Sequence, residues 1–128
     1  MIERRVASQL FPPPAYTHVA VATGTLVVTA GAVPLDAEGR LVGAGDAPAQ
    51  ARQVIANLLV QLREGSAEPE QIVKTTVYVV AGEPPMLSAV WEVVRESPLA
   101  GAPSTLLGVA ALGYEGQLVE IEALAVAQ

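Results

Sequence analysis

Two carboxylates near the end of the sequence, Glu120 and Glu122, are the first candidates for chemistry. They are two residues apart in an apolar segment, and alternate residues of a strand point to the same face. A carboxylate on an apolar face is costly unless it meets water or a partner. One of the two is therefore expected to line a wet cleft, where its pKa would rise into the range useful for moving a proton. The alternative, which spacing leaves open, is that both lie at a solvated sheet margin.

Other kinds of catalytic or metal site find little support. His18 is the only histidine, and a histidine without partners is more often structural than catalytic. The absence of cysteine excludes a thiol nucleophile and Cys-ligated metals, and the oxygen ligands form no calcium or zinc pattern, so no metal site is predicted. No phosphate-binding glycine loop or nucleophile elbow is present. Among the aromatic residues, Tyr16, Tyr78 and Trp91 are candidates for lining a pocket, the last two as core or interface residues.

The charge balance disfavours nucleic acid as a partner. The chain has 7 basic and 13 acidic residues, a net charge of −6, and its basic residues are scattered, whereas phosphate backbones require a cluster of cations. No apolar run is long enough to span a membrane, and no signal peptide is recognisable. We expect a cytoplasmic protein with no membrane association.

The elements that must position these residues indicate one α+β domain covering residues 1–128. A helix is predicted from Asp46, a plausible N-cap, to Gly65, and a second helix over residues 86–96. Strands are predicted at residues 4–10, 72–80, 105–112 and 118–126, and a hairpin joins strands at 18–23 and 26–33. The order is β-β-β-α-β-α-β-β.

Two helices can cover only one face of such a sheet. Each strand should then alternate between apolar residues on the covered face and polar residues on the open face. In residues 26–33 and 118–126, however, the residues of the second face are mostly small, β-branched or mixed. Exposed apolar patches of this size are avoided by monomers. We infer a homo-oligomer that packs its sheet faces together; the alternative is that a loop covers the second face.

The chain resembles the RidA family, also called YjgF or L-PSP, over nearly its whole length. The resemblance rests on motifs in a specific order and spacing, which occupy residues 14–16, 28–36, 39–42, 50–54, 57–58, 73–79 and 118–123. It implies a chorismate-mutase-like fold with two helices on one face of a mixed sheet. It also implies a homotrimer with a central barrel, and ligand clefts between the subunits.

The same resemblance implies a chemistry. Characterised members deaminate enamines and imines such as 2-aminoacrylate to a 2-keto acid and ammonia, without a cofactor. A glutamate matching Glu120 positions the attacking water, and an arginine before the second-last strand holds the substrate carboxylate. The matching cleft residues that remain here are Tyr16, Gly31 and Thr105.

This sequence departs from the family at the arginine. The family motif Pro-Ala-Arg-Ser/Thr-Thr is replaced by Gly101-Ala102-Pro103-Ser104-Thr105, which puts uncharged Pro103 or Ser104 at that position. A family asparagine on the second helix corresponds to Ser88. The cleft is therefore expected to be less cationic, and losing a charge-assisted contact weakens the binding of 2-imino acids.

Three functional hypotheses follow. In the first, inter-subunit clefts bind a small uncharged or cationic metabolite, and Glu120 handles a proton or water in an atypical imine or enamine deaminase. In the second, the protein is a non-catalytic ligand-binding or pathway accessory protein. The third, ribonuclease activity, is opposed by the acidic charge.

Overall fold

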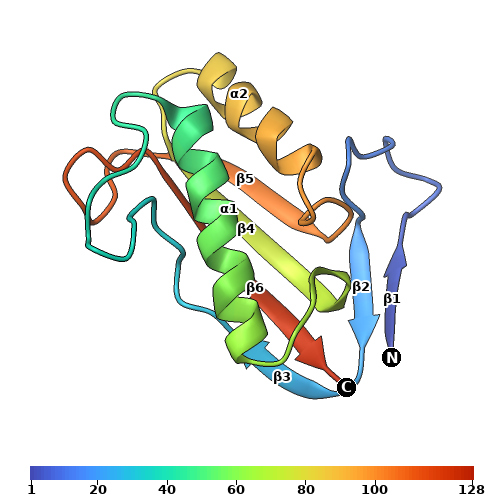
Figure 1. Cartoon of the computed structure of the whole chain (residues 1–128). Helices are drawn as coiled ribbons and strands as arrows, with labels where there is room; N and C mark the ends of the chain where they lie inside the picture. Colours follow the sequence, from blue (N-terminus) through green and yellow to red (C-terminus); the bar gives the residue numbers. More distant parts are fainter.

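A computed structural model describes residues 1–128, in which two helices lie on one face of a four-stranded sheet (Figure 1). The element order is the predicted β-β-β-α-β-α-β-β. The elements are β1 (Ile2–Arg5), β2 (Val19–Ala22), β3 (Thr25–Val28), α1 (Ala47–Glu64), β4 (Ile72–Val80), α2 (Pro84–Arg95), β5 (Ser104–Val109) and β6 (Val119–Ala127), with a short 3-10 turn at Pro69–Gln71. The main sheet has the order β3-β6-β4-β5, in which only β4 and β5 are parallel.

Helix α1 forms as its sequence predicts. The Asp46 side chain accepts a hydrogen bond from the backbone N–H of Ala49 at 3.0 Å and so caps the N-terminus. Gly65 ends the helix. The apolar stripe of Val54, Leu58 and Leu62 is fully buried against the sheet, and this burial is what holds the helix in place.

The predicted hairpin of residues 18–23 and 26–33 is wrong. Strand β2 pairs with β1 in a separate two-stranded sheet, and β3 pairs with β6 in the main sheet. Gly24, with φ +144°, lies where the chain passes from one sheet to the other. The first predicted strand, residues 4–10, is likewise shorter and earlier, at Ile2–Arg5.

The third strand also ends earlier than predicted, at Val28. Val28 lies opposite Leu124, and the chain next meets β6 at an isolated bridge between Ala32 and Ile121. The chain thus advances four residues from Val28 to Ala32, while β6 advances only three between Leu124 and Ile121. One extra residue on one strand is the geometry of a β-bulge. Because of the extra residue, Ala32 faces the helices and is buried, although Val28 faces the other way.

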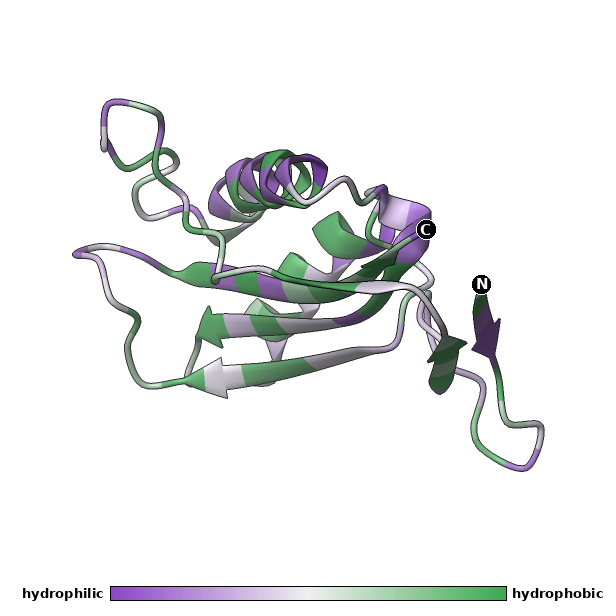
Figure 2. Cartoon of the chain, turned by 90° about the horizontal axis from the view of Figure 1, so that it is seen from below, coloured by the Kyte–Doolittle hydropathy of each residue, from purple (hydrophilic) through white to green (hydrophobic).

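The sheet face away from the helices is uncovered. Both helices pack against the face of the sheet that carries Val77, Val79 and Ile121, and Figure 2 shows α1 along one side of the strands. On β6, Val119, Ile121, Ala123 and Ala125 are buried, whereas on β3 Leu26 and Val28 are 65% and 64% exposed. No loop covers Leu26 or Val28, so the predicted alternative of a covering loop is not found, and the homo-oligomer stays a prediction.

A bulge in β4 produces one further difference from strict alternation. The register shifts between Ile72 and Lys74, and Ile72 is fully buried although alternation places it on the open face with Lys74.

Neither helix combines the length and the apolar character needed to cross a membrane. The cytoplasmic location stays a prediction.

Candidate active site

Glu120 and Glu122 lie on the open face of β6, as predicted, but in different surroundings. Glu120 is half-buried, and its Oε1 accepts a hydrogen bond from Gln117 Nε2 at 2.9 Å. Gln117 is itself buried and also donates to the Val119 carbonyl at 3.1 Å, so it holds the carboxylate in one orientation. The second oxygen, Oε2, accepts no hydrogen bond within the chain.

The Glu122 carboxylate is engaged by a phenol instead. Its Oε2 accepts a hydrogen bond from the Tyr78 hydroxyl at 3.0 Å. This bond raises the pKa of Tyr78 because it stabilises the neutral phenol; burial and the charges of Glu122 and Glu120 act in the same direction. Each glutamate thus has one oxygen in a side-chain hydrogen bond, with an amide at Glu120 and with a phenol at Glu122.

Gly31 lies directly against Glu120. A Cβ atom placed on Gly31 would stand 2.0 Å from Glu120 Oε2, far inside any allowed contact. Glycine permits this close approach, and not an unusual φ; a side chain at this position would force the Glu120 carboxylate to shift. The structure thus brings together two of the predicted site residues, and the backbone of Gly31 forms one wall beside the carboxylate.

Helix α1 fixes the segment that carries Gly31. Asn57 donates to the carbonyls of Val33 and Leu35 at 2.7 and 2.9 Å, and Gln61 donates to the Ala30 carbonyl at 3.1 Å. A hollow of about 560 Å³ opens between this segment and the helix. On sequence these two amides belong to the polar side of the helix, and nothing in the pattern shows that they bind a loop.

Gln50 performs the same task for the segment that leads into β6. It is fully buried and donates to the carbonyls of Gly43 and Gly116 at 3.2 and 3.0 Å, and its Oε1 accepts from the Leu118 N–H at 2.7 Å. Gln50 therefore positions the residues on either side of Gln117. The sequence analysis missed both glutamines; an uncharged amide three residues before Glu120 was the available signal.

A second group of predicted residues lies at the β5 edge. Tyr16 and Ser104 line a cavity of about 260 Å³ together with Pro14, Trp91 and Leu106. The rings of Tyr16 and Trp91 meet edge to face with centroids 6.1 Å apart. The Trp91 indole N–H donates to the Pro14 carbonyl at 3.0 Å, which ties the proline-rich segment to α2.

The other predicted residues lie apart from this cavity. Ser88 is exposed on α2 and lines the adjoining hollow of about 370 Å³. Thr105 points to the open face, where its hydroxyl accepts a hydrogen bond from Lys74 at 2.7 Å. Pro103 is buried and lines neither hollow; its carbonyl accepts from the Thr75 N–H at 3.0 Å at the start of the β4–β5 ladder.

His18 has a structural contact. Its Nδ1 accepts a hydrogen bond from the Ala7 N–H at 2.9 Å, and its ring meets Tyr16 edge to face. This bond occupies one ring nitrogen in holding the loop between β1 and β2. The histidine therefore helps to position Tyr16.

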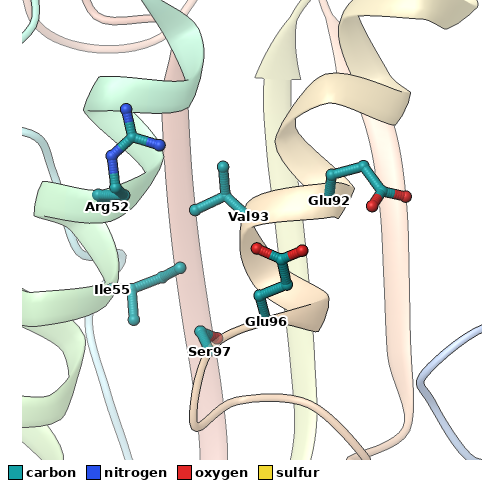
Figure 3. A pocket seen from close by; sticks show the side chains of 6 residues that line it. All are labelled: Arg52, Ile55, Glu92, Val93, Glu96 and Ser97. Carbon is teal, nitrogen blue, oxygen red and sulfur yellow. The ribbon is translucent and has the colours of Figure 1, made fainter.

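A charged groove between the helices contains none of the predicted residues. Arg52 of α1 and Glu96 of α2 lie on opposite sides of a space of about 330 Å³, and the Glu92 side chain points away from Arg52 (Figure 3). No three acidic or histidine side chains converge to hold a metal ion anywhere in the chain.

The site residues form two separate half-sites in one chain. The first, Gly31 with Glu120, lies near the β3 edge, and the second, Tyr16 with Ser104, lies at the β5 edge. Strand β4 runs between β6 and β5. In addition, Glu120 lies on the open face, whereas Ser104 lines a cavity on the helix side, so the two half-sites share no cavity within one chain.

Comparison with known proteins gives a consistent result. The family described as endoribonuclease L-PSP matches residues 7–127. YyfB of Yersinia pestis, of the Rid protein family, is 32% identical, with 98% of each chain covered and a TM-score of 0.87. YjgF of E. coli is 25% identical, with 98% of this chain and 94% of that chain covered and a TM-score of 0.69. A RutC family protein of Pyrococcus abyssi is 35% identical over 60 residues, so the match spans only 47% of that relative.

The contact between Gly31 and Glu120 leads to a first prediction. Gly31→Ala is expected to lower the free energy of unfolding by about 1–3 kcal/mol, because the new methyl group overlaps the carboxylate. Adding Glu120→Ala removes the overlap, so the double variant should lose less stability than the two single changes together. Urea denaturation at fixed protein concentration measures all three.

The matched control is Gly82→Ala, since a Cβ at Gly82 meets nothing within 4 Å. It should leave stability within about 0.5 kcal/mol. Strict additivity of Gly31→Ala and Glu120→Ala would contradict the close packing of these two residues.

A second prediction concerns Gln50. Gln50→Leu is expected to destabilise the chain by at least about 2 kcal/mol, because it leaves two carbonyls and one N–H without their partner in the core. Gln53→Leu on the same helix removes one bond to Asn57 and should cost less than half as much. Chemical denaturation of both variants tests this, and equal losses would show that Gln50 has no special role.

Proposed function

Since the chain belongs to the endoribonuclease L-PSP family, the family of the Rid and YjgF proteins, we propose that it is a homotrimer whose inter-subunit clefts hydrolyse a small imine or enamine. The observation that carries the proposal is the Glu120 carboxylate, which Gln117 orients through one oxygen while the other stands free beside the Gly31 backbone. A carboxylate held in this way can take a proton from water without moving.

The reaction needs only water and this carboxylate. Glu120 takes a proton from water as the water oxygen bonds to the iminium carbon, and the C=N electron pair moves onto nitrogen. The carboxyl group returns that proton to the nitrogen of the resulting carbinolamine. The C–N bond then breaks, the hydroxyl proton passes to the departing ammonia, and a carbonyl compound and an ammonium ion leave. An enamine enters this sequence after protonation at carbon.

The trimer is supported by the open face and by the position of the half-sites. Packing Leu26 and Val28 against another copy removes apolar area from water, at about 25 cal/mol per Å². The half-sites lie toward opposite edges of one sheet, so a closed ring places the β3 edge of one copy beside the β5 edge of the next. Each cleft would then contain Glu120 from one chain and Tyr16 from another.

A second candidate is a non-catalytic ligand-binding protein. The observation that favours it is the uncharged β5 residue Ser104, whose hydroxyl accepts a hydrogen bond from Thr75 at 2.7 Å inside the sheet. Without a charge at this position the cleft could bind a metabolite and leave it unchanged. RNA cleavage, named in the family description, is opposed by the net charge of −6.

The proposed activity makes a third prediction. Glu120→Gln should lower kcat for imine hydrolysis by about 10²–10⁴-fold, because the amide cannot accept the proton of water. Glu122→Gln is the control, since that carboxylate is engaged by Tyr78, and it should change kcat by less than about threefold. Ammonia release from freshly generated imines measures the rates. Full activity in Glu120→Gln would contradict the role of Glu120 as the base. Ligand binding without turnover in the native protein would favour the non-catalytic ligand-binding protein.

The proposed assembly makes a fourth prediction. Sedimentation equilibrium at micromolar concentration should give three times the chain mass of 13.2 kDa. Val28→Glu, which places a charge on the open face, should shift the protein toward monomer. Ala56→Glu, on the exposed side of α1, should remain trimeric. A single 13.2 kDa species for the native chain would refute the trimer and the shared cleft together.

A further inference from the structure

The groove between the two helices has no part in the proposed hydrolysis, although it places two opposite charges on either side of one hollow. We propose that this groove is a second ligand site, which binds a linear zwitterion whose carboxylate and ammonium groups are separated by a short aliphatic chain, an ω-amino acid. The groove belongs to a single chain, so the inference depends neither on the trimer nor on the hydrolytic reaction.

The hollow combines charged sides with an apolar floor. Its volume is about 330 Å³, with Arg52 of α1 on one side and Glu96, at the C-terminal end of α2, on the other (Figure 3). Two apolar side chains, Ile55 and Val93, also line it, one from each helix. Ile55 is only 6% exposed, and Val93 packs against the hydrophobic core. Core packing therefore holds this floor in place.

The two charges are not neutralised within the chain. Its ion pairs join other residues, and Arg52 and Glu96 form none, either with each other or elsewhere. Glu92, the other acidic residue of the hollow, pairs with Arg95 at 3.5 Å and points away from Arg52. A ligand that carries both charges can therefore pair with both side chains without breaking an existing ion pair.

Each end of the hollow suits one end of such a ligand. The Arg52 guanidinium presents a planar fork of N–H donors that matches a carboxylate. The Glu96 carboxylate accepts from an ammonium group, and the C-terminal end of α2 adds partial negative charge on the same side. Ser97 fixes this end, because its hydroxyl donates to the Val94 carbonyl at 2.6 Å and accepts from the Leu99 N–H at 3.1 Å. Methylene groups between the two ends would leave water for the apolar floor.

The groove is separate from both half-sites. None of its lining residues lines the cavity of Tyr16 and Ser104, and Glu120 lies on the opposite face of the sheet. The proposed trimer packs the open sheet faces together and leaves the helices outside. A ligand can therefore reach the groove in the assembled protein.

Two isomers test the need for separated charges. 5-Aminovalerate carries its charges at the two ends of a methylene chain, whereas norvaline carries both on one carbon. In an NMR titration of the ¹⁵N-labelled protein, 5-aminovalerate should cause saturable shifts at the backbone amides of the groove. Binding in the millimolar range is expected, because contacts to exposed charges are weak. Norvaline should bind about threefold more weakly or worse, and so should valerate and pentylamine, which each lack one charge.

Single variants assign the two ends of the site. Arg52→Met should weaken 5-aminovalerate binding about threefold or more and leave pentylamine binding unchanged. Glu96→Gln should weaken 5-aminovalerate binding to the same extent and leave valerate binding no weaker. Arg63→Met and Glu64→Gln are the matched controls, since they make the same charge changes at the exposed end of α1, outside the groove. Both controls should bind 5-aminovalerate as the native protein does.

The outcomes that would overturn the inference are specific. They are the absence of a saturable shift with 5-aminovalerate, shifts confined to residues outside the groove, equal binding of norvaline, or native affinity in both Arg52→Met and Glu96→Gln. Failure of the proposed function is detected separately by the ammonia assay, because absence of imine hydrolysis does not alter binding in the groove.

Discussion

The extra residue between Val28 and Ala32 is the constraint on which the site and the open face depend. Without it, the edge segment would keep one alternation from Leu26 onward, and Ala32 would share the uncovered face with Val28. With it, Ala32 enters the core while Leu26 and Val28 stay outside. The same irregular segment brings the bare backbone of Gly31 against the Glu120 carboxylate. A local change of register thus shapes both the surface available for assembly and one wall of the candidate site.

The two glutamates of β6 differ in their hydrogen-bond partners. Both lie on the same face, where strand β4 runs alongside. Tyr78 gives Glu122 a strong partner, and the cost is a phenol whose pKa is raised. Gln117 gives Glu120 an amide partner, also at one oxygen only. The buried amide also donates to the Val119 carbonyl and so holds the carboxylate in one orientation, which is what a general base needs.

Local sequence signals predicted the regular elements well and their pairing poorly. The Asp46 cap, the apolar stripe ending at Leu62 and the shared face of Glu120 and Glu122 follow from rules that act within a few residues. The pairing of β3 with β6 instead of β2 joins residues about a hundred positions apart, so a turn signal at Gly24 could not reveal it. The bulges near Val28 and Ile72 also escaped prediction, because they arise in the pairing of these strands with β6, which is distant in sequence. Each bulge reverses the alternation of faces along its strand. The family resemblance supplied the fold, but it pointed to Pro103 and Thr105, which lie away from the Tyr16 cavity in this chain.

The uncharged Ser104 fits its surroundings at the start of β5. Its hydroxyl accepts a hydrogen bond from Thr75, which is buried on the helix side of the sheet. A charged side chain that began at this position would have to be desolvated next to Thr75, which is expensive. An edge strand without a fixed charge here is also better suited to packing against another copy of the chain, because no charge would have to be buried in the contact.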